Sequence, residues 1–120
     1  TVYNTILKDV SGIRLTIPSA NVHHAYYKYY FFIEPNRYTT RDKLIKLIND
    51  WGVFCQVGSC GELYNETALR DFTPSKKLIN TQILFETSIL LKCDPSMNKT
   101  TAVNNINIIK NILNIALHNE

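Results

Sequence analysis

The order of apolar and polar residues predicts alternating helices and short strands. Apolar residues recur at helical spacing from residue 1 to about residue 9, and Ser11 with Gly12 ends this first helix. Residues 13–17 then alternate between apolar and polar side chains, which indicates a strand. Residues 24–33 are so rich in aromatic side chains that we expect one long strand, covered on both faces and therefore central in a sheet.

Capping residues mark the next elements. Thr40 is the expected N-cap of a helix over residues 41–50, and Gly52 stands at the usual C′ position of that helix. Residues 53–57 (VFCQV), which are apolar except for Gln56, predict a second short central strand. The pair at positions 73–74, Thr followed by Pro, is expected to begin a third helix that runs to about residue 85.

The C-terminal third predicts one more strand and one more helix. Residues 87–91 (TSILL) are expected to form a core strand, and residues 93–96 are expected to form a turn. Thr100 or Thr101 is expected to cap the last helix. Its predicted buried stripe consists of Val103, Ile106, Ile109, Leu113 and Leu117.

This order of elements predicts an α/β fold in which one small sheet of about four strands packs against helices. The chain has 120 residues, 45% of them hydrophobic, which suits a single domain over residues 1–120. No apolar run approaches the roughly 20 residues that a membrane-spanning helix needs, so we expect no membrane partner. No signal peptide precedes the first helix, and a start at Thr1 near the end of a helix leads us to expect a fragment of a longer protein.

Charge and cysteine content narrow the class of protein further. The net charge is +3, but the 13 basic residues are scattered and only Lys76 and Lys77 are adjacent. Nucleic-acid binding usually shows a clustered basic face, so we expect no nucleic-acid partner. The three cysteines are an odd number without metal or disulfide spacing, which predicts a reduced, cytoplasmic compartment.

The most distinctive polar segment is residues 58–64 (GSCGELY), which follows the apolar run at 53–57. Its glycines suggest a phosphate cradle, but the Lys-Ser/Thr pair of a nucleotide P-loop is missing. Cys60 is a candidate nucleophile, yet no histidine is near it in sequence to serve as a base. Both of these sites are disfavoured, and the segment is either a loop that carries binding groups or a plain connection between two elements.

A pair of histidines and a run of aromatic residues are each either functional or structural. His23 and His24 are adjacent on a predicted strand, so they point to opposite faces and cannot share one metal. The aromatic residues 26–32 resemble a base-stacking platform, but they lack the glycine of an RNA-recognition strand. Core packing against helices is the favoured interpretation of these aromatic side chains.

Three segments carry a family resemblance when they are read in order. They are residues 24–30 (HAYYKYY), residues 58–64, and residues 85–91 (FETSILL) followed by 94–97 (DPSM). Their order and spacing resemble the C-terminal small domain of the DegT/DnrJ/EryC1/StrS family of nucleotide-sugar aminotransferases. The resemblance covers nearly the whole chain. Asp94 departs from the family pattern, because many relatives have histidine before the proline at this turn.

The resemblance implies a homodimeric fold-type-I enzyme that depends on pyridoxal 5′-phosphate (PLP). Such an enzyme transfers an amino group, usually from glutamate, to a nucleotide-linked keto sugar for cell-surface polysaccharide, lipopolysaccharide or antibiotic sugars. The small domain packs on the large PLP domain of the same chain and helps to close the sugar side of the site. The Schiff-base lysine and the acidic partner of the pyridinium lie in the large domain. The fragment is therefore expected to be inactive alone and to bind no cofactor.

Carried over by position, the residues implied to line the substrate site are Ser59, Cys60, Glu62, Tyr64, His24 and Tyr26. Their implied role is substrate positioning, so no catalytic or metal-binding residue is predicted. Glu62 and Tyr64 have a second interpretation as loop anchors. Three alternatives for the chain stay open: a free-standing βαβ module that binds RNA or a small ligand, a purely dimerising domain, and a piece of a non-catalytic relative.

Overall fold

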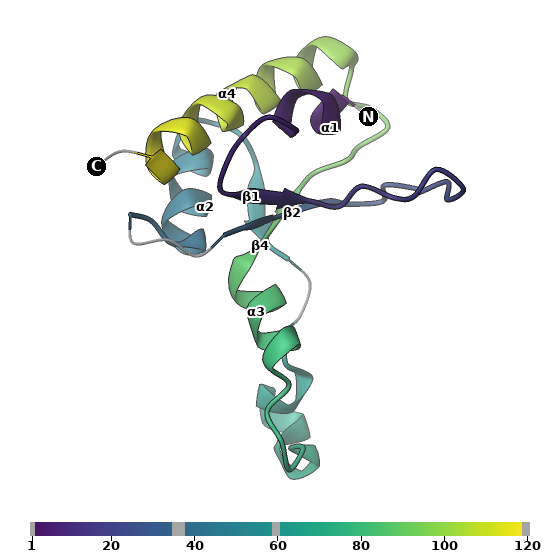
Figure 1. The fold of residues 1–120 in the computed structure, drawn as a ribbon, viewed down its shortest axis with the longest axis vertical. Coiled ribbons are helices and arrows are strands. Elements are labelled where there is room, and N and C mark those ends of the chain that lie inside the picture. Colours follow the sequence, from purple (N-terminus) through teal and green to yellow (C-terminus); the bar gives the residue numbers. More distant parts are fainter. Residues whose placement is uncertain (1, 35–37, 59–60, 119–120) are drawn as a thin grey trace.

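The structure is a computed structural model that describes residues 2–34, 38–58 and 61–118. Its helices and strands follow one another in the predicted order (Figure 1). They are α1 (Val2–Leu7), β1 (Ile13–Leu15), β2 (Tyr29–Ile33), α2 (Arg41–Asp50), β3 (Cys55–Val57), the 3-10 helices η1 (Leu63–Asn65) and η2 (Thr67–Phe72), α3 (Ile79–Thr87), β4 (Ser88–Leu91) and α4 (Lys99–His118).

The four strands form one antiparallel sheet in the order β1-β2-β4-β3. Strand β2 lies between β1 and β4, with Tyr29 opposite Leu91, so the predicted central position of this strand is confirmed. The predicted fold class, a small sheet packed against helices, is also confirmed. Strand β3 was expected to be central and is instead an edge strand, because among the described residues it pairs only with β4.

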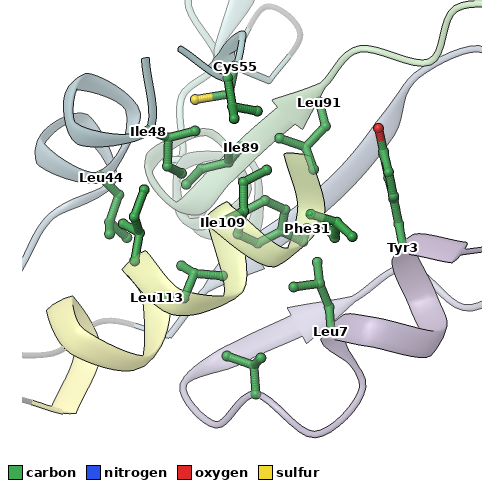
Figure 2. Close-up of a cluster of buried hydrophobic side chains, with 14 of the residues drawn as sticks. Tyr3, Leu7, Phe31, Leu44, Ile48, Cys55, Ile89, Leu91, Ile109 and Leu113 are labelled. Atoms are coloured by element: carbon green, nitrogen blue, oxygen red, sulfur yellow. The ribbon is translucent and has the colours of Figure 1, made fainter. Parts of the chain in front are cut away.

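One face of the sheet packs against α1, α2 and α4, and this contact forms the core (Figure 2). Tyr29, Phe31 and Ile33 alternate along β2 toward this face and are buried, while the two residues between them are partly exposed. Burial of apolar surface is the main term that holds such a domain together. The helices contribute Leu7, Leu44, Ile48, Ile109 and Leu113 to this cluster.

The aromatic segment is shorter as a strand than the sequence predicts. Strand β2 begins at Tyr29, and residues 24–28 are irregular. The reason lies at Tyr26, which has a φ of +46°. No strand residue adopts a left-handed φ, so the extended backbone cannot run through this position. The prediction of one strand over residues 24–33 is therefore wrong for its first half.

The third helix begins later than predicted. Thr73 ends η2 instead of capping a helix, because both its backbone N–H and its hydroxyl donate to the carbonyl of Arg70. Helix α3 starts at Ile79. The Thr-Pro pair therefore marks the end of η2 and not, as predicted, the start of the next helix.

Capping chemistry sets the ends of the other two long helices. The hydroxyl of Thr40 accepts a hydrogen bond from the Lys43 backbone, and Gly52 follows α2 with a φ of +80°, so both predicted ends of α2 are confirmed. Helix α4 begins two to three residues earlier than expected, because its cap is Asn98 and not Thr100 or Thr101. The side chain of Asn98 accepts from the Thr101 N–H at 2.8 Å and caps this helix in place of a threonine.

Residues 61–87 form an arm that projects from the sheet on the side away from α1 and α4 (Figure 1). The arm makes the molecule elongated, with extents of 48 × 39 × 27 Å. Its helix α3 buries a single side chain, that of Thr87. Within the part of the chain that the structure describes, no helix has both the length and the apolar character to cross a membrane.

Candidate functional site

The residues predicted to line a substrate site lie in two groups at opposite ends of the sheet. His24 and Tyr26 precede β2, whose first residue, Tyr29, pairs with the last residue of β4. Glu62 and Tyr64 follow β3 in the arm, beyond Gly58, whose N–H donates to the carbonyl of Ser88, the first residue of β4. The domain does not bring the two groups together in one pocket. Ser59 and Cys60 lie outside the described residues.

Glu62 and Tyr64 are hydrogen-bonded to each other. The Tyr64 hydroxyl donates to Glu62 Oε1, and the Asn65 side chain donates to Glu62 Oε2 at 3.0 Å. The hydrogen bond to Glu62 is the largest cause of the raised pKa of Tyr64, and desolvation and the carboxylate charge add to it. The pair therefore holds η1 in shape. A role in substrate binding stays a prediction for both residues.

The two glycines of this loop are required by packing. A Cβ on Gly58 would lie 2.3 Å from the Ser88 hydroxyl oxygen, and a Cβ on Gly61 would lie 2.4 Å from the Phe85 ring. A real Cβ essentially never lies this close to a non-bonded heavy atom, so each glycine allows the loop to approach β4 or α3 closely. Steric fit against the domain accounts for these glycines without a phosphate ligand.

The side chain of Arg41 binds the backbone carbonyl of Phe85 near the end of the arm. Arg41 of α2 donates from its guanidinium to the Phe85 carbonyl and lies 5.0 Å from the centroid of the Phe85 ring. This contact ties the start of α2 to the end of α3. It had no sequence signal, because Arg41 and Phe85 are far apart in the chain.

His24 and Tyr26 form a compact unit before β2. The His24 Nδ1 accepts the backbone N–H of Tyr26 at 2.8 Å, and the two rings lie 4.3 Å apart. The Tyr26 ring also stacks on Tyr29, with centroids 6.1 Å apart. His23 is exposed, and no group of three metal-ligating side chains occurs among the described residues.

Asn4 of α1 joins this unit and was not recognised in the sequence. Its amide nitrogen donates to the Tyr26 hydroxyl at 3.1 Å, and its amide oxygen accepts from the Tyr29 hydroxyl at 2.7 Å. Tyr29 is buried, and desolvation is the main cause of the raised pKa of its hydroxyl. The only available signal was helical spacing, which places Asn4 on the same side of α1 as Tyr3 and Leu7.

Tyr26 borders a cavity of about 540 Å³ between α1, the start of β2 and the turn after β4. Its wall includes aromatic side chains and Asp94. Lys92 Nζ lies 2.8 Å from Asp94 Oδ2. The hydroxyl and the backbone N–H of Ser96 both donate to Asp94 Oδ1. These hydrogen bonds, that of Lys92 first, hold the pKa of Asp94 well below its usual range. The cavity thus has an ionised and well-fixed carboxylate at its edge.

Packing in the core accounts for two of the aromatic side chains of β2. Tyr29 and Phe31 are buried in the core, which confirms the packing interpretation for these two side chains. All strand pairs of the described sheet are antiparallel, so the parallel pairing of a βαβ module does not occur there.

These features define a small α/β domain whose antiparallel sheet carries polar loops at both ends. A sequence model of the DegT/DnrJ/EryC1/StrS aminotransferase family matches residues 1–110. The chain belongs to this family. A comparison with curated proteins gave no match.

Solved structures share this fold. An aminotransferase from Psychrobacter cryohalolentis matches 97% of this chain with a TM-score of 0.78 and 24% identity. PseC of Helicobacter pylori, an aminotransferase involved in the biosynthesis of pseudoaminic acid, matches 93% with a TM-score of 0.81 and 15% identity. An E. coli GDP-4-keto-6-deoxy-D-mannose-3-dehydratase with bound hydrated PLP matches 93% with a TM-score of 0.75 and 14% identity. At these identities the likeness shows the fold alone.

The chain spans about a third or less of these proteins, namely 32%, 30% and 28% of their lengths. More than two thirds of each structure therefore lies outside the part that this chain matches.

Proposed function

We propose that this chain is the C-terminal domain of a PLP-dependent aminotransferase that acts on a nucleotide-linked keto sugar. In this proposal the domain helps to close the substrate site and is inactive alone. The observation that carries the proposal is the family match over residues 1–110. The E. coli relative, whose name specifies PLP and a nucleotide-linked keto sugar, supports the cofactor and the substrate class.

In this proposal the PLP site lies in the large domain and not in this chain. A Schiff-base lysine needs a desolvated setting and an acidic partner for the pyridinium nitrogen. None of the nine lysines is buried, and Lys46 and Lys92 are paired with aspartates at the surface. We therefore assign the cofactor and all proton transfers to the proposed large domain, and derive no chemical step for this chain.

The separation of the two predicted site groups supports a long substrate. Strand β4 runs from Ser88 to Leu91 between them, which is three residue steps or roughly 10 Å. A ligand that touches both ends of the sheet must be longer than a single sugar ring. A nucleotide-linked sugar meets this requirement, whereas a free monosaccharide does not.

The exposed apolar side chains of the arm support a protein partner. A concentration of large exposed apolar residues on one element marks an interaction surface. We propose that the arm packs on the large domain of the same chain or on the second subunit of a homodimer. The cytoplasm is the proposed location and rests on the three cysteines. The residues of the arm that carry this argument are Leu63, Phe72, Leu78, Ile79, Ile83 and Leu84.

The test is to sequence and express the complete reading frame that contains this chain. We expect it to encode a domain with a PLP-binding lysine, and the expressed protein to form 2-oxoglutarate from glutamate when a nucleotide-linked keto hexose is supplied. The 120-residue chain alone is the control and should form none. A reading frame without such a lysine contradicts the proposal, and so does loss of water from the sugar without amino transfer.

The substrate-wall role of Glu62 and Tyr64 has a separate test in the complete protein. If these residues contact substrate, Glu62→Gln and Tyr64→Phe raise KM for the nucleotide sugar while PLP absorbance is unchanged. If they only anchor the loop, the same variants lower the melting temperature and leave KM unchanged.

A further inference from the structure

Tyr26 has a backbone conformation that a bulky residue adopts only under constraint. Its φ is +46°, and no other non-glycine residue of the described chain has a positive φ. The left-handed region costs free energy for a side chain with a Cβ. Strained residues persist where the surroundings over-determine them, and they are concentrated at functional sites. The positive φ of Tyr26 therefore makes this residue a candidate functional residue.

Three neighbours hold Tyr26 in place. Its N–H is fixed by the Nδ1 of His24 at 2.8 Å, its ring stacks on Tyr29, and its hydroxyl lies 3.1 Å from the amide nitrogen of Asn4. Asn4 is therefore the contact that acts on the phenolic oxygen itself.

The orientation of the Asn4 amide decides where the Tyr26 hydrogen points. The buried Tyr29 hydroxyl needs an acceptor for its hydrogen, and Asn4 Oδ1 supplies it at 2.7 Å. The amide NH₂ is then left to donate to Tyr26, whose oxygen accepts. The Tyr26 O–H hydrogen consequently has no acceptor among the described side chains.

Tyr26 lines the cavity of about 540 Å³, whose size is in the range of small-molecule sites. Tyr3 and Tyr27 offer apolar ring surface to a ligand there, and the ionised Asp94 offers acceptor oxygens. No lysine or arginine is among the described residues that line the cavity, so these residues offer no positive charge to a phosphate group. One fixed donor, one carboxylate and aromatic walls suit the hydroxyls and the C–H faces of a neutral sugar ring.

We propose that Tyr26 donates a hydrogen bond to an oxygen of the sugar ring in this cavity, and that Asn4 is the positioning residue that directs this hydrogen. The inference takes the sugar as ligand from the proposed function. It assigns the sugar to the β2 end of the sheet, and thus leaves the nucleotide to the other end or to the rest of the protein.

The test is binding of UDP-glucose to this chain, followed by NMR shifts of the tyrosine rings, with UDP as the second probe. We expect UDP-glucose to shift the Tyr26 ring signals and UDP to leave them unchanged. Tyr26→Phe removes only the hydroxyl and should weaken UDP-glucose binding roughly 3- to 10-fold, the size of one neutral hydrogen bond.

Asn4→Asp is the decisive variant. A carboxylate only accepts, so Tyr26 must turn its hydrogen toward residue 4 and away from the cavity. We expect Asn4→Asp to weaken binding as much as Tyr26→Phe, and the double variant to be no weaker than either single one. Asn104→Asp, the same change at an exposed position of α4, is the matched control and should bind as the parent does. Circular dichroism of each variant checks that it folds.

Three results would overturn the inference: no Tyr26 shift with UDP-glucose, an equal shift with UDP alone, or full affinity in a folded Asn4→Asp variant. If Tyr26-dependent binding is found but the complete protein transfers no amino group, the proposed function fails and the sugar site stands. If amino transfer is found without Tyr26-dependent binding, the inference fails and the function stands.

Discussion

The side-chain amide of Asn49 makes two hydrogen bonds to the backbone of Cys55. Its nitrogen donates to the Cys55 carbonyl at 2.8 Å, and its oxygen accepts from the Cys55 N–H at 3.2 Å. On the other side Cys55 stands opposite Leu91 of β4. Asn49 at the end of α2 thus takes the place of a neighbouring strand and covers the free edge of β3. Exposed edges are prone to pair with other chains, so this cover also protects the domain from aggregation.

Asn49→Ala should destabilise the domain. The change leaves a backbone donor and a backbone acceptor of a buried residue without partners, which costs about 1–3 kcal/mol of unfolding free energy. Urea denaturation measures the loss. Asn107→Ala removes an exposed amide from α4 and is the control, with an expected change within about 0.5 kcal/mol. Equal stability of the two variants would show that the amide bridge is dispensable.

Gly61→Ala and Gly52→Ala should lower the free energy of unfolding by different amounts, because one causes a steric clash and the other only an unfavourable φ. An added Cβ at Gly61 meets the Phe85 ring at 2.4 Å, so the loop or α3 must shift, at about 1–3 kcal/mol. At Gly52 nothing lies within 4 Å, and only the φ of +80° is unfavourable, at about 1 kcal/mol. Melting curves of both variants compare them. A Gly61→Ala variant as stable as the parent would mean that the loop packs differently.

Stability should fall at alkaline pH because of Cys55. Burial raises the pKa of this thiol from 9.0 to about 11. The folded state therefore keeps the proton when the unfolded state has lost it. The contribution is complete below about pH 9 and is lost as pH rises toward about 11, by on the order of 1–2 kcal/mol.

Urea denaturation from about pH 8 to about pH 10.5 tests this prediction, with Cys55→Ala as comparison. The variant is less stable overall but should lose less free energy over that interval. Some alkaline loss persists in the variant, because the raised pKa of the buried Tyr29 acts in the same direction. Identical pH slopes in the two proteins would contradict the role of Cys55.

Truncation should destabilise the domain much more at one position of α4 than at another position two residues away. Leu113 is fully buried in the hydrophobic core, whereas Ile115 is 59% exposed. Leu113→Ala should cost about 2–5 kcal/mol, through lost burial and the cavity left behind. Ile115→Ala should cost less than about 1 kcal/mol. Chemical denaturation of both variants checks the difference, and similar losses would mean that Ile115 is covered by another surface.

The candidate site was predictable from sequence only as a set of segments. The polar loop after β3 and the aromatic segment before β2 were both found, because their composition marks them. Their separation across the sheet was not, because it depends on the pairing of β2 with β4. The Asn4 contacts to Tyr26 and Tyr29 and the Arg41 contact to Phe85 join residues that are distant in the chain, so no local pattern signals them.

The sequence by itself determined the features that rest on local chemistry. The Thr40 cap and Gly52 define α2, and four of the five residues in the predicted α4 stripe are buried, because caps and helical periodicity act within a few residues. Only the tertiary structure decided that β3 is an edge strand braced by Asn49 and that Tyr26 leaves the strand. The physical reason is that strand pairing, close packing and side-chain hydrogen bonds between distant elements arise only when the chain has folded.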